Sequence, residues 1–139
     1  MRLRRDVKVE LIGRVPLFER CSKRELAAIA GIADQVDLPE GRVLVREGTL
    51  GQEFFVLTEG SAEVRRAGRL VSTLGPGDFF GEIALVSNVP RTATVTTVSP
   101  VRALVVSGRD FWTLLDESPR TQRKILEAVG DRLAVLSAS

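Results

Sequence analysis

Hydrophobic and polar positions divide the chain into three stretches of different rhythm. In residues 6–33 the apolar residues recur at helical spacing, which predicts two helices. The first is expected over residues 6–16. The second begins behind Ser22, which forms a capping box with Glu25: the serine hydroxyl can accept from the third helical amide while the glutamate reaches back to the cap. The apolar face of this second helix consists of Leu26, Ala27, Ile29, Ala30 and Ala33.

Residues 34–107 have the pattern of short strands. β-Branched and aromatic residues occur in runs such as 43–45 and 54–57, and glycine turns close these runs at a spacing of about 8–12 residues. That spacing is typical of an antiparallel sandwich or barrel. The pattern predicts a mainly β protein with flanking α segments, built as an eight-stranded antiparallel jelly-roll β-barrel.

Residues 108–139 return to helical spacing. A short helix is predicted over residues 109–115, and Ser118 then supplies an N-cap with Pro119 at the first helical position. Gly130 lowers the helix propensity of the last helix by about 1 kcal/mol relative to alanine, so we expect packing to hold it. Its predicted apolar stripe consists of Ile125, Leu126, Val129, Leu133 and Leu136.

The composition is that of one globular domain, and it excludes several classes of chemistry. Of the 139 residues 44% are hydrophobic and 27% are charged, and no linker divides them, so residues 1–139 are interpreted as a single domain. Cys21 is the lone cysteine and the chain has no histidine. Ser-His-Asp and Cys-His catalysis, and metal sites built on imidazole or several thiolates, are therefore excluded. We expect neither an enzyme nor a metal site.

Charge and targeting signals point to a cytoplasmic protein. Twenty Lys and Arg oppose 18 Asp and Glu, a net charge of +2. The short basic run over residues 2–5 ends at Asp6 and is interpreted as a solvated terminus, so no direct nucleic-acid binding is expected. No apolar signal-peptide core follows it, and no stretch approaches the ~18 apolar residues of a membrane span.

A short helical segment interrupts the β region and carries the candidate chemistry. Residues 80–86 have helical character, and a turn ending at Pro90 leads into a predicted strand over residues 91–95. A helix starting beside Gly81 would direct its first amides and the positive end of its dipole outward. Arg91 can fork onto two phosphate oxygens, and Glu82 can accept from a diol. The combination suits a sugar phosphate with one negative charge.

Each of these residues also has a simpler interpretation when taken singly. An acidic residue is favoured at any helix start, and an arginine after a proline is often a surface ion-pair partner. The glycines at 75, 77 and 81 do not form a dinucleotide fingerprint, because their spacing is one residue too long and no parallel βαβ pattern surrounds them. The distinguishing feature is the run Gly-Glu-x-Ala-Leu from Gly81, followed after four residues by Pro-Arg-Thr-Ala-Thr from Pro90.

This run, residues 80–95, resembles the phosphate-binding cassette of cyclic nucleotide-binding domains. Turn and strand positions such as residues 39–41, 46–48 and 74–79 also match that family, and the similarity extends over about residues 15–135. The resemblance is to a catabolite-activator-like sensor domain without the DNA-binding part. It implies N-terminal helices over 6–33, a jelly-roll barrel over 34–107 with a short phosphate-binding helix, and C-terminal lid helices over 108–139.

The resemblance also implies roles for individual residues. Glu82 and the backbone of Gly81 are expected to hold the ribose 2′-hydroxyl. Arg91 is expected to pair with the exocyclic phosphate oxygen, helped by the amides of Ala84 and Thr92. The remaining candidate ligand contacts are the cassette residues Ile83 and Ala93, an apolar wall of Val64, Val71 and Leu74, and Arg132 or Ser137 of the last helix, which would read the purine edge.

We therefore expect a sensor of cyclic AMP, with cyclic GMP as the alternative because a hydroxyl at Thr92 can serve either nucleotide. No cofactor is implied. Ligand would close residues 111–136 onto the barrel and so switch an unknown protein effector or a fused domain. The alternative is a structural or oligomerisation jelly roll without a ligand, against which Glu82 and Arg91 argue. A homodimer is also possible through the stripe Ile125, Val129, Leu133 and Leu136, although intramolecular packing explains the same pattern.

Overall fold

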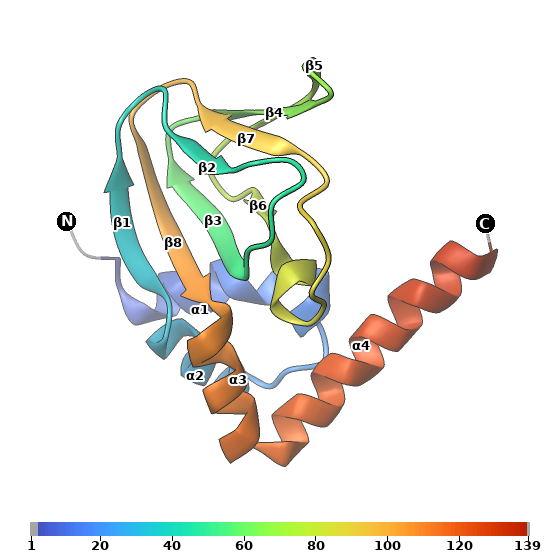
Figure 1. Cartoon of the computed structure of the whole chain (residues 1–139). Helices are drawn as coiled ribbons and strands as arrows, with labels where there is room; N and C mark the ends of the chain where they lie inside the picture. Colours follow the sequence, from blue (N-terminus) through green and yellow to red (C-terminus); the bar gives the residue numbers. More distant parts are fainter. Residues whose placement is uncertain (1–2, 139) are drawn as a thin grey trace. The chain divides into compact units, whose positions relative to one another are not determined.

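The computed structural model describes residues 3–138, with side chains through residue 130. The chain forms two compact units: Met1–Ile32 together with Arg109–Ser139, and Ala33–Gly108. The first unit is helical, and the second contains the strands (Figure 1).

The β unit consists of two four-stranded antiparallel sheets, ordered β1-β8-β3-β6 and β2-β7-β4-β5 (Figure 1). The predicted antiparallel β architecture is confirmed, but the closed barrel is wrong. A barrel needs every strand to be paired on both sides. Here β6 has only two residues, and among the described strands β5 pairs with β4 alone. The strands are β1 (Asp34–Leu38), β2 (Val43–Val45), β3 (Glu53–Glu59), β4 (Ala62–Arg66), β5 (Arg69–Leu74), β6 (Phe79–Phe80), β7 (Thr94–Thr97) and β8 (Val101–Ser107).

Side chains from both sheets form the core of the β unit. Leu57 and Ala103 of one sheet are fully buried in the same cluster as Ala62 and Val95 of the other. The buried hydroxyl of Thr97 is satisfied by backbone groups, because it donates to the Pro39 carbonyl at 2.6 Å and accepts from a backbone amide at 2.8 Å. These contacts attach β7 to the connection between β1 and β2. Strand β7, which contains the last residues of the cassette, is thereby fixed in position.

A two-residue turn connects β4 and β5. Ala67 and Gly68 have φ angles of 51° and 78°, as a type I′ turn requires. The pairing register shifts between Val64, opposite Ser72, and Arg65, opposite Leu70. A bulge therefore leaves one residue of β5, Val71, without a direct partner.

Local signals determine the N-terminal helices. Helix α1 (Arg5–Gly13) ends before Pro16, where the sequence predicted its end. A proline disfavours helical backbone in the residue before it, and Val15 is accordingly extended. The 3-10 helix η1 (Pro16–Phe18) follows. Helix α2 (Lys23–Gly31) begins at the predicted capping box: Glu25 N donates to Ser22 Oγ at 3.2 Å, and Ser22 N to Glu25 Oε1 at 2.8 Å.

The C-terminal helices are α3 (Gly108–Glu117) and α4 (Pro119–Ala138), and α4 begins where Ser118 predicted. The buried face of α4 contains Thr121, Ile125 and Ala128. Leu126 is 53% exposed, so its place in the predicted stripe is wrong: it is about 100° around the helix from Ile125. Because Ile125 is buried within its own unit, it does not support a dimer surface. Leu133 and Leu136 of that stripe lie outside the described side chains.

One carboxylate connects α2 to α4 inside the helical unit. Glu25 accepts from Thr121 Oγ1 at 2.9 Å and from Lys124 Nζ at 2.6 Å, in addition to the capping bond. Burial acts to raise the pKa of Glu25, but the hydrogen bonds from Lys124, Ser22 and Thr121 outweigh it and hold the pKa at about 2. Burial and the nearby Glu25 raise the pKa of Cys21 to about 11, so this thiol is not an activated nucleophile.

Candidate functional site

A cavity of about 390 Å³ opens in the β unit beside the short 3-10 helix η2 (Glu82–Leu85). Three segments contribute to it: one face of the sheet β2-β7-β4-β5, the start of η2, and the loop before β7. Of the residues predicted from the sequence, it contains Val64, Leu74, Gly81, Glu82, Ile83, Ala84, Arg91, Thr92 and Ala93. Val45, Arg66, Ser72, Phe80, Val89, Pro90 and Val95 complete its lining.

The start of η2 requires a glycine for two reasons. Gly81, the N-cap, has a φ of 86°, which side chains disfavour. A Cβ at this position would lie 2.7 Å from the carbonyl oxygen of Glu53 and 2.8 Å from Nη1 of Arg91. The absent side chain therefore lets the guanidinium approach the helix start. The sequence predicted that the start of the short helix and Arg91 would lie together, and they do.

Backbone bonds hold Arg91 against a neighbouring turn. Its amide donates to the Thr49 carbonyl, and its carbonyl accepts from Gly48, both at 2.8 Å. These bonds explain why β7 starts at Thr94 and not at Arg91 as predicted: residue 91 pairs with the turn before the chain enters the sheet. The side chain is only 7% exposed. Its position is therefore fixed by the fold.

The guanidinium of Arg91 has a partner that the sequence did not reveal. Nη2 donates to the Glu53 carbonyl at 2.9 Å and to the Glu53 carboxylate at 3.3 Å. Burial lowers the pKa of Arg91, and the charge of Glu53 and its hydrogen bond oppose that effect, so the group remains a cation. Glu53 lies at the start of β3, 38 residues earlier in the chain, and no local motif marks it.

One part of the predicted phosphate site is corrected. The amide of Ala84 donates to the Gly81 carbonyl at 3.1 Å and is therefore already used. In an α-helix the third amide would lack an internal partner, whereas the i→i+3 bond of a 3-10 helix consumes it. Ala84 lines the cavity, but its amide is not the open donor that we expected.

The bulge in β5 corrects a second prediction. Val71 is 53% exposed and does not line the cavity, whereas the neighbouring Ser72 does. Ser72 is directly opposite Val64, and directly paired residues share a face of the sheet. The bulge next to this pair sets which β5 residues face inward. The other predicted wall residues, Val64 and Leu74, do line the cavity.

Arg66 is a charged cavity residue that the sequence did not predict. Its Nε donates to the carbonyl of Thr92 at 3.1 Å. A basic residue next to Arg65 at a hairpin end carries no local signal of this contact. The predicted purine readers, Arg132 and Ser137, lie outside the described side chains.

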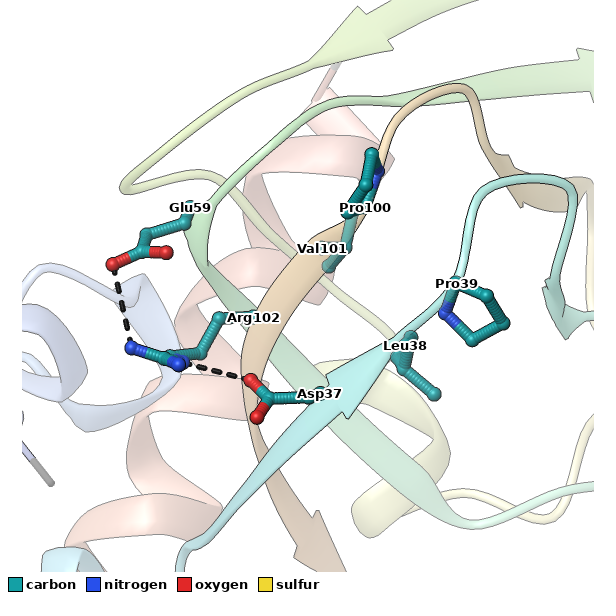
Figure 2. A pocket seen from close by; sticks show the side chains of 7 residues that line it. All are labelled: Asp37, Leu38, Pro39, Glu59, Pro100, Val101 and Arg102. Atoms are coloured by element: carbon teal, nitrogen blue, oxygen red, sulfur yellow. Dashed lines mark hydrogen bonds and ion pairs between the residues drawn. The ribbon is translucent and has the colours of Figure 1, made fainter. Parts of the chain in front are cut away.

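A second hollow of about 390 Å³ lies in the other sheet and contains none of the predicted residues (Figure 2). In it Arg102 donates to Asp37 at 2.7 Å and to Glu59 at 3.5 Å. The hydrogen bond between Arg102 and Asp37 lowers the pKa of the aspartate and raises that of the arginine. Both carboxylates are largely exposed, so this is an ion-pair cluster in contact with solvent. Leu38, Pro39, Pro100 and Val101 form the rest of its lining.

The described residues provide neither a metal-ion cluster nor a membrane-spanning helix. No group of three or more acidic, histidine or cysteine side chains could hold a metal ion in the part of the chain with assigned positions. Within the same described part, no helix has the length and apolar character needed to cross a membrane.

A family model for the cyclic nucleotide-binding domain matches residues 35–118, which include both sheets and the cavity. This chain belongs to the cyclic nucleotide-binding domain family. The resemblance of the cassette is thereby confirmed, and the family is one of regulatory ligand-binding domains.

Similar proteins carry this domain in several settings. The chain is 35% identical to a cAMP-dependent protein kinase regulatory subunit of Mycosarcoma maydis, over 98% of this chain and 28% of that protein. It is 36% identical to a putative potassium channel protein of Rhodopseudomonas palustris, over 93% and 32%. The chain thus spans about a third of the length of the curated relatives it matches.

Solved structures agree on the fold. The N-terminal domain of a transcriptional regulator from Streptomyces coelicolor A3(2) superposes with a TM-score of 0.83 at 28% identity, covering 93% of this chain and 96% of that one. A cyclic nucleotide-binding-like protein from Brucella abortus gives a TM-score of 0.73 at 25% identity, covering 80% and 99%.

Proposed function

We propose that this chain is a sensor that binds one cyclic purine nucleotide in the cavity beside η2. Cyclic AMP is the preferred ligand and cyclic GMP the alternative. The observation that carries the proposal is the position of Arg91, a buried cation at a cavity whose volume of about 390 Å³ is in the range of small-molecule sites. The cytoplasmic location predicted from the sequence remains part of this proposal.

The free donor on Arg91 supports binding of a phosphate. In the described part of the chain Nη2 makes all of the hydrogen bonds of this guanidinium. No buried side-chain nitrogen or oxygen among the described residues lacks a partner, so the unbonded Nη1 is accessible. A cyclic phosphodiester carries one negative charge, and an arginine donor held ready by the fold can meet it without rearrangement.

The rest of the cavity suits a nucleoside. Glu82 is half-buried at the cavity and presents a carboxylate that can accept from the ribose 2′-hydroxyl. Val64, Leu74 and Val95 provide an apolar surface for the sugar and base. An acceptor, a cation and an apolar wall in one cavity match the chemistry of a cyclic nucleotide.

Calorimetric titration with cyclic AMP, cyclic GMP and AMP tests the assignment. Arg91→Ala should lower the affinity for the preferred cyclic nucleotide by about 2–4 kcal/mol, roughly 30- to 1000-fold. Arg91→Lys should lose less affinity than Arg91→Ala, since lysine keeps the positive charge but cannot donate two parallel hydrogen bonds to one phosphate. Arg42→Ala is the matched control, because it removes an exposed arginine from the same unit. Unchanged binding by Arg91→Ala would exclude this pocket, and no binding by the wild type would favour the structural jelly roll.

We also propose that ligand binding is transmitted by movement of residues 111–136 to a protein effector or a fused domain. A ligand can shift such an equilibrium only by its differential affinity for the two states. Amide hydrogen exchange along α4, with and without cyclic nucleotide, measures this directly. Identical protection in both states would refute the proposed movement while leaving nucleotide binding intact.

A further inference from the structure

The hairpin of β4 and β5, at the outer end of its sheet in Figure 1, carries two arginines that face each other across the strands. Arg66 and Arg69 are direct cross-strand partners, and like charges in that position destabilise a hairpin. Within the described residues neither arginine forms an ion pair with a carboxylate. The adjacent Arg65 differs, because it pairs with Glu63 at 3.0 Å.

The turn between these arginines is also conformationally unfavourable, in addition to the repulsion between the two charges. Ala67 adopts a left-handed φ of 51°, which costs an alanine about 1 kcal/mol. The carboxylate of Glu47 accepts from the Ala67 amide at 2.9 Å, so it holds the turn in place without pairing with Arg66. Unfavourable backbone conformations and like-charge pairs of this kind are common at functional sites.

The hairpin reaches the cassette through Arg66. Its Nε donates to the carbonyl of Thr92, the residue after Arg91, at 3.1 Å. Both Arg66 and Thr92 line the cavity. The two terminal nitrogens of Arg66 have no hydrogen-bond partner among the described residues. A single side chain therefore links β4 to the cassette and also presents, at the cavity, a cation that forms no ion pair among the described residues.

We propose that Arg66 is a second arginine of the nucleotide site, acting as a positioning residue and as an electrostatic attractor. Its bond to Thr92 holds the backbone that carries Arg91, and its charge draws the anionic ligand toward the cavity. This inference rests on the proposed function. Because Arg66 is exposed, its electrostatic contribution is screened by salt, whereas the direct contact of the buried Arg91 with phosphate is screened much less.

Titrations with cyclic AMP and cyclic GMP at two ionic strengths test this role. At about 0.01 M salt the Debye length is about 30 Å, and at about 0.15 M it is about 8 Å. Arg66→Gln should weaken binding about three- to tenfold at low salt and flatten the salt dependence. Arg66→Lys should retain the salt dependence, because the charge remains. Arg65→Gln makes the same change in net charge one residue away, outside the cavity, and should leave both quantities near wild type.

The outcomes separate this inference from the proposed function. If the wild type binds a cyclic nucleotide and Arg66→Gln binds it equally well at both salt concentrations, the role of Arg66 is refuted and the sensor proposal stands. An equal effect of Arg65→Gln also refutes it, because net charge alone would then account for the result. If the wild type binds neither nucleotide at either salt concentration, both proposals fail.

Discussion

Replacing Glu25 with glutamine should destabilise the helical unit at neutral pH and have much less effect in acid. The carboxylate has a side-chain exposure of only 12% and accepts hydrogen bonds from Ser22, Thr121 and Lys124. Glutamine has nearly the same size and keeps one acceptor oxygen. However, it removes the charge and places an amide donor where one carboxylate oxygen was. The ammonium of Lys124 then loses its counter-ion in a partly buried position.

The expected magnitude follows from the pKa of Glu25. It is lowered from an ordinary value of 4.5 to about 2, which corresponds to at most about 3 kcal/mol of stabilisation. Because the Lys124 side chain is 30% exposed, water can partly solvate the ammonium left behind, and we expect a loss of about 2 kcal/mol. The folded-state pKa lies below the unfolded one, so this stabilisation is complete above pH 4.5 and is lost as the pH falls toward 2.

Urea denaturation of the wild type and the variant at about pH 7 and about pH 3 measures this loss. The gap in unfolding free energy should shrink by more than half at the lower pH. Glu10→Gln is the control: its ion pair with Arg14 has a similar distance of 2.7 Å, but both side chains are exposed, and such a pair contributes at most about 0.5 kcal/mol. A Glu25→Gln variant as stable as wild type at neutral pH, or a gap that does not change with pH, would refute the reasoning.

Two further substitutions examine the β unit. Gly81→Ala should lower both the thermal midpoint and the affinity for cyclic nucleotide, the latter by more than about tenfold, because the new Cβ meets the Glu53 carbonyl at 2.7 Å and the backbone is left-handed. Gly31→Ala, at the exposed end of α2 and with nothing within 4 Å, is its control. This change should leave binding unchanged and stability equal or up to about 1 kcal/mol higher. Equal behaviour of the two variants would contradict the argument. Thr97→Val should cost about 1–3 kcal/mol in urea denaturation, since two backbone groups lose their partner, and a loss below about 0.5 kcal/mol would show that water replaces it.

Features that depend on neighbours in the sequence were predictable. The capping box at Ser22 and Glu25 formed as expected, because its partners are three residues apart and bond within one turn. Strands β3, β4 and β5 end at the expected glycine turns for the same local reason. The cassette was recognisable because Gly81, Glu82 and Arg91 belong to one short segment, and the structure places all three at one cavity. Two details depart from that local prediction: η2 is a 3-10 helix, which engages the Ala84 amide, and β7 starts at Thr94 instead of Arg91.

Features that depend on partners distant in the chain were decided by the tertiary structure. Glu53 reaches Arg91 across 38 residues, and Arg66 reaches Thr92 across 26, and no spacing rule links either pair. The bulge that turns Ser72 inward in place of Val71 depends on the register between two strands. The amino-acid sequence by itself thus determined which residues of the cassette could bind an anion, since that depends on residue type and local backbone. Which charges are compensated, and which arginines are left to meet a ligand, depended on the packing of strands onto one another.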